Sequence, residues 1–484
     1  MSEIVQRFAR IARDQPDRPL VYAAATNEVN TASLLWQAHL ELRERLTAAG
    51  LQNDQLVVSA AGNRPASISL LLACLALRTP LMPVDAGSTQ AEILEFAERF
   101  GASAIILPKA AALAGTAPST PLLGDLHIVR RDGAPIDYRG AALLKLTSGS
   151  TGLPKTTLTT EHHLIADGER IAEAMGITPG DIQMASIPLS HSYGLGVIVM
   201  PLVTQGTAIV LREPFIPQQF LLDARRFQAR VFPGVPYMFN YFVANPPEDG
   251  WPSCLRQLIS AGARLEPKTV DDFRARFGVK IHSFYGTTET GGIAFDADDV
   301  PSRDGDVGTL MPGVTLTVRP DEGAPPGSGR LLVRSTSVAS GYLGIPDEEH
   351  DPFIDGGFLT GDYGFVDTNE RLMLSGRASV AVNVAGRKVH PAEVERVLRS
   401  MPGIDDVCVI AAPDRRRGQQ IVACVASQKS LSTMEVRQFC AASLAPYKIP
   451  RAIIFLRSLP TTPRGKIDHA TLLALALEQL NTTT

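Results

Sequence analysis

The segment at residues 146–155, Leu-Thr-Ser-Gly-Ser-Thr-Gly-Leu-Pro-Lys, constrains the possible folds more than any other part of the chain. Five of its ten side chains carry a hydroxyl or an ammonium group, and its glycines permit the positive φ angles that bring a backbone close to a ligand. Successive N–H groups in such a turn form an anion-binding concavity. Residues 141–146 before it and 155–160 after it are typical of extended chain. The segment therefore predicts a phosphate-binding loop between two strands, with an ordinary polar hairpin turn as the alternative.

This loop differs from the Walker pattern, in which Gly-Lys-Ser/Thr opens a helix. It resembles instead the signature of the adenylate-forming superfamily, Thr-Ser-Gly-Ser/Thr-Thr-Gly-x-Pro-Lys, which residues 147–155 match throughout. That superfamily includes acyl- and aryl-CoA synthetases, adenylation domains of peptide synthetases and beetle luciferases. The resemblance implies that the loop holds the phosphates of ATP beside Mg²⁺, which Thr151 helps to bind. The residues concerned are Thr147, Ser148, Gly149, Ser150, Thr151, Gly152 and Lys155.

The length and the rhythm of the chain predict more than one domain. A chain of 484 residues is too long for a single core. Helical and extended patterns alternate as far as residue 290, which favours doubly wound α/β subdomains, and short strands after Gly305 favour a β-rich subdomain. A small α+β unit follows near residue 375. We expect an adenylation domain at 1–375 and, from the resemblance, a small mobile catalytic domain at 376–484.

Particular segments carry this prediction. The patterns predict helices at 66–77, 92–99, 163–175, 193–203, 391–399 and 433–444, and strands at 55–59, 104–107, 183–187, 208–211, 316–319, 330–334, 406–411 and 421–426.

Composition limits the classes of function. The chain has a net charge of −4, but from Gly376 onward 15 Lys and Arg face 8 Asp and Glu. Such a basic tail suits polyphosphate chemistry or simple charge complementarity between the two domains, and its spread charges do not favour nucleic-acid binding.

The five cysteines show no Cys-x-x-Cys pair, so reduced structural thiols are expected. No transmembrane segment and no signal peptide are predicted, and we expect a cytoplasmic protein.

A second motif lies at residues 283–292, Ser-Phe-Tyr-Gly-Thr-Thr-Glu-Thr-Gly-Gly. It matches the family's Tyr-Gly-x-Thr-Glu, which implies that Tyr285 stacks on adenine, Thr288 meets the α-phosphate and Glu289 holds Mg²⁺. A carboxylate oxygen suits that ion. Ser283 and Gly286 belong to the same nucleotide-binding stretch, and a glycine-rich turn with an exposed Glu is the alternative. Upstream, Gly262 and Ala263 resemble the small residues beside the adenine, although they also suit a tight turn.

Two motifs near the end of the chain complete the nucleotide site that the resemblance implies. Thr-Gly-Asp at 360–362 places Asp362 on the ribose hydroxyls, and Arg377 matches an arginine that contacts ribose or phosphate. Residues 459–468 match Pro-x-Thr-x-x-Gly-Lys, so Lys466 would offset the repulsion between carboxylate and α-phosphate. The alternative is that Lys466 is an ordinary solvent-exposed lysine in a glycine-containing turn.

Residues 187–196 match the family's acyl-pocket segment. His191 stands where amino-acid-activating relatives place an aspartate, and an imidazole cannot supply that fixed negative charge. A plain carboxylic acid, aliphatic or aromatic, is therefore expected. The residues that could line its pocket include His191, Tyr193, Val235, Tyr237 and Ile293. The alternative for each of them is ordinary packing in the protein core.

The match is weaker at the hinge. The family's Asp or Lys is replaced by Ser379, and a lysine common in CoA ligases is replaced by Asn383. These departures put the thioester-forming step in question. The expected activity is conversion of an acid to acyl-AMP with ATP and Mg²⁺, followed by transfer to coenzyme A. The alternatives are loading of a carrier-protein phosphopantetheine and a non-catalytic acyl- or nucleotide-binding regulator.

Overall fold

The computed structural model describes residues 2–109, 119–147, 155–321, 324–343, 351–377, 382–384, 387–389, 391–414, 418–442, 444, 448–462 and 467–482. Contacts divide the chain into two compact units. The first comprises Met1–Leu316, Val333–Leu359 and Val366–Met373, and the second comprises Thr317–Leu332, Thr360–Phe365 and Leu374–Thr484. The assignment of 1–375 and 376–484 as functional domains stays a prediction.

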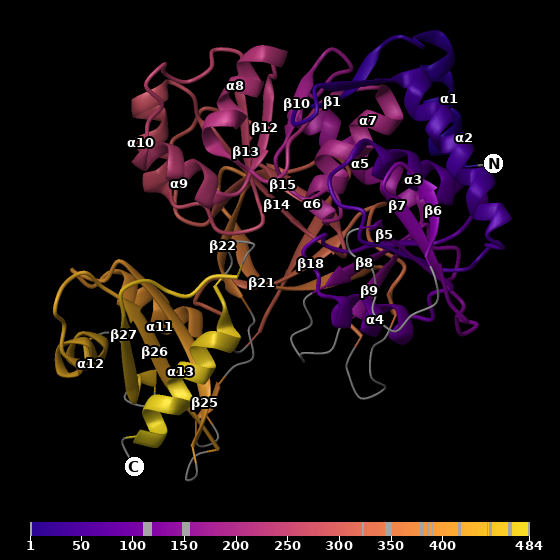
Figure 1. The fold of residues 1–484 in the computed structure, drawn as a ribbon. Coiled ribbons are helices and arrows are strands. Elements are labelled where there is room, and N and C mark those ends of the chain that lie inside the picture. The colour runs from indigo at the N-terminus through magenta and orange to yellow at the C-terminus, as the bar shows by residue number, and fades with distance from the viewer. Residues whose placement is uncertain are drawn as a thin grey trace. The chain divides into compact units, whose positions relative to one another are not determined.

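A mixed sheet forms the centre of the first unit (Figure 1). Its strands lie in the order β16-β15-β14-β13-β12-β10-β11-β1-β2, and the pairs from β14 to β1 are parallel. In chain order they are β1 (Pro19–Ala23), β2 (Glu28–Thr31), β10 (Ile182–Ala185), β11 (Ala208–Leu211), β12 (Val231–Gly234), β13 (Gln257–Ser260), β14 (Ile281–Thr287), β15 (Gly291–Phe295) and β16 (Asp306–Leu310). The central parallel strands β11 and β12 are buried along their whole length and carry no charged or polar side chain, as expected for a sheet covered by helices on both faces.

A second sheet of the first unit carries the loop motif. Its order is β19-β9-β8-β4-β3-β5-β7-β6, and β8 and β9 form an antiparallel hairpin around the loop. The strands are β3 (Val57–Ser59), β4 (Leu81–Pro83), β5 (Ala104–Pro108), β6 (Thr120–Leu123), β7 (Leu126–Arg130), β8 (Leu143–Thr147), β9 (Lys155–Thr159) and β19 (Tyr342–Leu343).

The helices of the first unit follow from apolar periodicity and from caps. The helix α3 is apolar almost all round and lies buried, with Pro65 at its first turn. The helix α5 starts at a Thr160 cap and ends at Gly176 in the left-handed region. The set is α1 (Glu3–Asp14), α2 (Ala32–Ala48), α3 (Pro65–Leu77), α4 (Gln90–Arg99), α5 (Glu161–Met175), α6 (Ser192–Gly194), a π-helical turn (Leu195–Val199), α7 (Met200–Gln205), α8 (Pro217–Phe227), α9 (Pro236–Ala244) and α10 (Pro267–Phe277).

A buried charge network closes the last segment of the first unit. Arg371 donates to carboxylates of Asp296 and Asp306 at 2.7 and 2.8 Å, and also to Asp298. Lys280 pairs with Asp296 at 2.8 Å. Removing one partner from such a cluster leaves a buried charge without compensation, so the network fixes strand β22 (Arg371–Arg377) where it begins.

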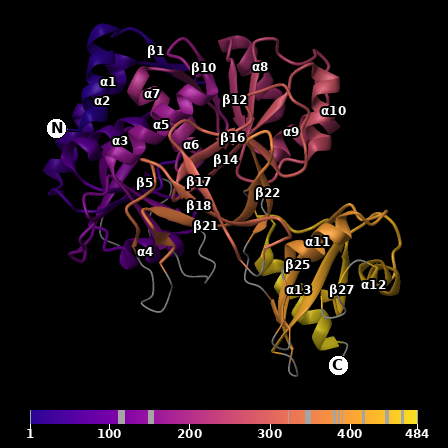
Figure 2. The same cartoon turned by 180° about the vertical axis from the view of Figure 1, so that it is seen from behind.

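The later strands and the small domain complete the chain. The strands are β17 (Thr315–Arg319), β18 (Gly329–Arg334), β20 (Phe353–Ile354), β21 (Gly357–Val366), β23 (Val382–Val384), β24 (Arg387–Val389), β25 (Asp406–Asp414), β26 (Gly418–Ala426) and β27 (Ala452–Leu456). The helices are α11 (Pro391–Arg399), α12 (Thr433–Ala441) and α13 (His469–Thr482). Alternate residues of β25 and β26 face opposite sides, so one core contains α11 and α12 and the other contains α13 (Figure 2).

The α/β architecture and the small C-terminal unit agree with the predicted fold class. All five cysteines are free thiols. Within the described ranges, none of the helices has the length and apolarity needed to cross a bilayer.

Candidate active site

The segments predicted to bind nucleotide and acid converge because of strand direction. In the first unit, β10, β12, β13 and β14 are parallel neighbours. Parallel strands place their carboxyl ends at one edge of the sheet, which is where open α/β sheets bind ligands. The segment 187–196 follows β10, Val235 follows β12, Gly262 follows β13, and Tyr285 lies near the end of β14.

The turn that carries Glu289 joins β14 to β15, and two glycines determine its shape. A Cβ on Gly286 would lie 2.4 Å from the carbonyl oxygen of Gly291. Gly291 has a φ of +69°, and its Cβ would lie 2.1 Å from the carboxylate of Asp167. Only glycine fits at either position. Tyr285 is buried on β14, and Thr288 is half-buried in the turn.

Helix α5 supports this turn from behind. The Asp167 carboxylate accepts a hydrogen bond of 2.8 Å from the Gly292 backbone N–H. Arg170 donates to the Ser337 hydroxyl at 2.7 Å, and Ser337 donates to the Thr290 carbonyl at 2.6 Å. The backbone that follows Glu289 therefore has two defined partners.

Glu289, Tyr342 and Lys155 form one connected cluster. The Glu289 side chain is buried and accepts a hydrogen bond from the Tyr342 hydroxyl. The Lys155 ammonium lies 4.5 Å from the centre of the Tyr342 ring, within the range of a cation–π contact. The structure thus brings together two predicted residues that are 134 positions apart, through a tyrosine of β19 that pairs with β9.

The hairpin fixes the ends of the predicted phosphate loop. Thr147 and Lys155 are register partners, and the Thr147 hydroxyl donates to the Lys155 carbonyl at 3.3 Å. Ser148, Gly149, Ser150, Thr151 and Gly152 lie outside the described residues.

His191 and Tyr193 lie in the segment predicted to line the acid pocket. His191 Nε2 lies 3.5 Å from a carboxylate oxygen of Asp85, which follows β4. The Tyr193 hydroxyl donates to the Ile259 carbonyl at 3.0 Å, and its ring packs against Phe284. Burial raises the pKa of the Tyr193 phenol well above its usual value, so it remains a donor at neutral pH.

The other predicted nucleotide and acid residues differ in exposure. Ser283 and Val235 are half-buried, Ala263 is exposed, and Gly262 has a φ of +82°. Tyr237 is 45% exposed, whereas Ile293 is fully buried in β15. The roles of these residues in binding remain predictions.

The second unit holds the predicted ribose site. The buried Asp362 carboxylate accepts a hydrogen bond of 2.7 Å from Nε of Arg377, whose side chain is 73% exposed. These two predicted residues therefore meet. Lys466 and Ser379 lie outside the described residues, and Asn383 lies on β23.

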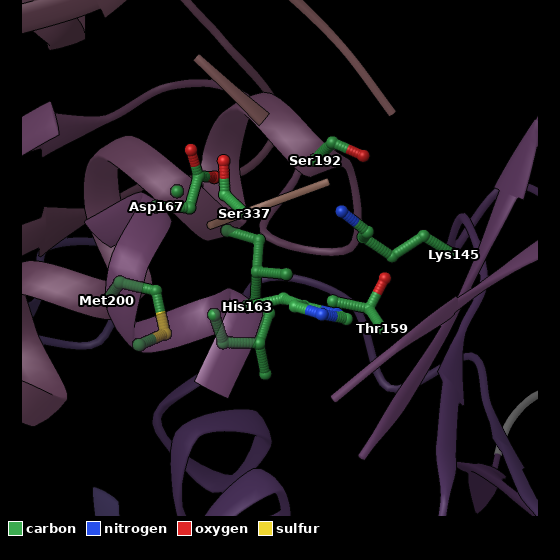
Figure 3. Close-up of a pocket in the computed structure, with 10 residues that line it drawn as sticks. Lys145, Thr159, His163, Asp167, Ser192, Met200 and Ser337 are labelled. Atoms are coloured by element: carbon green, nitrogen blue, oxygen red, sulfur yellow. The ribbon is translucent and has the colours of Figure 1, made fainter. Parts of the chain in front are cut away.

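The sequence analysis did not predict Tyr342, Asp167 or Lys145 as site residues. Asp167 and Lys145 line a recess together with Thr159, His163, Ser192 and Ser337 (Figure 3). A lone lysine in the apolar strand Leu-Leu-Lys-Leu was the available signal for Lys145. No local pattern marks Tyr342 or Asp167, because their importance comes from residues distant in sequence.

Comparison of the sequence with known protein families identifies the family to which the chain belongs. The model of the AMP-binding enzyme family matches residues 8–343, and the model of its C-terminal domain matches residues 393–466. The chain belongs to the AMP-binding enzyme family, the adenylate-forming superfamily. Within it, the chain is an AMP-forming acid–thiol ligase of the acyl-CoA synthetase type.

Curated relatives support this assignment, and a solved structure supports the fold. Sulfoacetate–CoA ligase of Cupriavidus necator is 30% identical over 96% of each chain. Feruloyl-CoA synthase of an Amycolatopsis species is 28% identical over 88% of this chain and 90% of that one. The fold matches ATP-bound MatB of Rhodopseudomonas palustris with a TM-score of 0.78 at 23% identity, covering 97% of this chain and 98% of the other.

Proposed function

We propose that this ligase uses ATP to convert a carboxylic acid, aliphatic or aromatic, to acyl-AMP with release of pyrophosphate, and then transfers the acyl group to coenzyme A. In the first step a carboxylate oxygen attacks the α-phosphorus and pyrophosphate leaves. In the second, the thiol attacks the acyl carbon and AMP leaves. The observation that carries the proposal is the cluster of Lys155, Tyr342 and Glu289 beside the loop and the carboxyl edge of the sheet.

The site's chemistry fits a magnesium ion that arrives with the nucleotide. Among the described residues, no group of three or more His, Cys, Asp or Glu could form a protein cage for a metal. One buried carboxylate, Glu289, supplies hard oxygen donors, and Mg²⁺ in nucleotide enzymes commonly takes one or two carboxylates plus phosphate oxygens. We therefore assign Glu289, with Thr151, to the ion, which when bound would neutralise phosphate charge.

The chain's own residues would divide the remaining work. Tyr285 would stack on adenine, Thr288 would donate to the α-phosphate, and Asp362 would accept from the ribose hydroxyls. Lys155 and Lys466 would place positive charge where two anions meet, which lowers the barrier electrostatically. The Tyr342 hydroxyl orients Glu289, since a hydrogen bond to a carboxylate fixes which oxygen stays available.

Coenzyme A is the acceptor that we favour over a carrier-protein phosphopantetheine. The curated relatives named above are a sulfoacetate–CoA ligase and a feruloyl-CoA synthase. Competition between coenzyme A and a phosphopantetheinylated carrier would separate the two.

A pyrophosphate-release screen tests the function. The purified chain is given Mg-ATP and a panel of fatty, benzoic, cinnamic and dicarboxylic acids, and acyl-AMP is trapped with hydroxylamine. We expect acid-dependent pyrophosphate release that Lys466→Ala abolishes. Absence of acyl-AMP with every acid would reject the proposal and favour the non-catalytic regulator, whose regulatory effect Lys466→Ala would leave intact.

A further inference from the structure

The recess behind the hairpin contains a lysine with an unusual environment. Lys145 lies on β8, two residues before Thr147, and is only 5% exposed. Its side chain leaves the strand on the face opposite Leu144, which belongs to the core of that sheet. Figure 3 shows its amino group extending into the recess, with Ser337 and Asp167 on the far side.

The Lys145 ammonium has no hydrogen bond and no ion pair within the part of the chain that the structure describes. Only the more distant charges of Asp167 and Glu289 act on it, and they offset part of the effect of burial, which lowers the pKa of Lys145. A buried cation without a direct partner is costly, because it has lost water and gained nothing equivalent. An anionic ligand would supply the partner that this ammonium lacks.

The neighbouring Asp167 does not neutralise this lysine directly. Its carboxylate accepts from the Gly292 N–H at 2.8 Å and lies against Gly291, so it is engaged by the turn that follows Glu289. Burial raises the pKa of Asp167, with Lys145, Gly292 and Arg170 acting in the opposite direction. His163 lies on the same wall. Burial is the main cause that lowers its pKa to about 4, so its imidazole is neutral at pH 7.

The remaining wall identifies the class of ligand. Ser192, Leu195 and Gly196 line the recess and come from the segment assigned to the acid pocket. Lys155 already lies at the end of the loop assigned to the phosphates, so a second cation that faces the acid segment has a different task. The uncharged hydroxyls of Ser192 and Thr159 also line the recess and can donate hydrogen bonds, whereas Ser337 already donates to the Thr290 carbonyl.

We propose that Lys145 is a specificity-determining residue that binds a second anionic group on the acid substrate, so that the preferred acids carry a carboxylate or sulfonate besides the one that is activated. This inference rests on the proposed function, because it names the substrate class of the same site. The ammonium would form a charge-assisted hydrogen bond with that group at a buried site, where water screens such bonds less than at the surface.

The test compares matched acids on matched variants. Dicarboxylates from malonate to adipate and terephthalate are compared with their monoamides, which keep the shape and lose one charge. Wild type, Lys145→Met and Lys145→Arg are assayed for pyrophosphate release, with Lys268→Met, an exposed lysine of α10, as the control for loss of one charge. Thermal unfolding checks that each variant is folded.

We expect wild type and Lys268→Met to prefer one dicarboxylate over its monoamide, and Lys145→Met to lose about 10- to 100-fold of that preference with the KM for ATP unchanged. Lys145→Arg should retain most of it. A wild type that accepts only monoanionic acids, an unchanged preference in Lys145→Met, or a loss that appears equally for all acids as a raised KM for ATP would each overturn the proposal. The last result would assign the lysine to phosphate.

Failure of the proposed function gives a different result. If no acid is adenylated, calorimetric titration of wild type and Lys145→Met with the same dicarboxylates and monoamides still decides the role of Lys145. Tighter binding of a dicarboxylate by wild type alone supports the anion site, and equal binding by both rejects it.

Discussion

At the scale of single residues, the site depends on groups that hold the reactive ones in place. Tyr342 connects Glu289 to Lys155, and Asp167 holds the backbone beyond Glu289. Neither residue has to touch a substrate for its loss to matter, because the orientation of a buried carboxylate depends on its hydrogen bonds.

Tyr342→Phe should weaken the response to magnesium while the fold is kept. It removes a hydrogen bond to a charged acceptor, which is worth about 1.5–3 kcal/mol. We expect the Mg²⁺ concentration for half-maximal adenylation to rise about tenfold, and Glu289→Gln to reduce adenylation more strongly. If Tyr342→Phe lowers the rate equally at all Mg²⁺ concentrations, Glu289 is not the metal ligand.

His39 gives a prediction about pH. It lies fully buried on α2 beside Trp36, and burial, followed by the charge of Arg43, lowers its pKa to about 4. The ordinary value is about 6.5, so the unfolded chain binds a proton first as the pH falls. The stabilisation is complete above pH 6.5 and is lost between pH 6.5 and 4, by roughly 3 kcal/mol.

His39→Phe keeps a ring against Trp36 and removes this titration. The difference in free energy of unfolding between wild type and variant, measured by urea titration, should shift in favour of the variant by roughly 3 kcal/mol from pH 7 to pH 4. A constant difference across that range would contradict the prediction.

At the scale of elements, sequence patterns located most helices and strands and left the contacts between them undetermined. Predicted helices at 391–399 and 163–175 correspond to α11 and α5, because their apolar periodicity is local. The helix predicted at 193–203 is interrupted by a π-helical turn at Leu195–Val199, which apolar periodicity does not reveal. The sequence located the extended segments on either side of the loop and the turn that carries Glu289, but the Tyr342 and Asp167 contacts arise only when β19 and α5 pack.

Gly291 tests the geometry of the turn. Gly291→Ala combines a positive φ with a methyl group 2.1 Å from the Asp167 carboxylate, so the turn must move. We expect adenylation to fall about 100-fold or more, since small displacements of catalytic groups cost that much.

Gly278→Ala is the matched control for this substitution. Gly278 also has a positive φ, of +73°, but nothing lies within 4 Å of an added Cβ. It should cost about 1 kcal/mol of stability and leave the activity unchanged. Equal losses of activity in the two variants would mean that strain, and not the contact with Asp167, is responsible.

At the scale of the whole molecule, each unit has hydrophobic cores of its own. One core of the first unit includes Val58, and one core of the second includes Val425, and both side chains are completely buried. Separate cores predict separate unfolding transitions, since two-state behaviour belongs to single domains.

Val425→Ala and Val58→Ala form a matched pair for calorimetry. Each deletes the same two methyl groups from a buried site, at a cost of about 2 kcal/mol. We expect two transitions, with Val425→Ala lowering only that of the second unit, by roughly 10 °C, and Val58→Ala lowering only the other. A single transition that both variants shift would show that the units unfold together.

The Arg371 network also sets a limit on where any pivot can lie. Three carboxylates hold this guanidinium, and Asp296 among them follows directly after β15 and donates its backbone N–H to the Ser283 carbonyl. The chain leaves the first unit for the last time at Met373, two positions later. Rotation at Arg371 would separate these charges from their partners, so a pivot for the mobile domain that the sequence predicts has to lie beyond this residue.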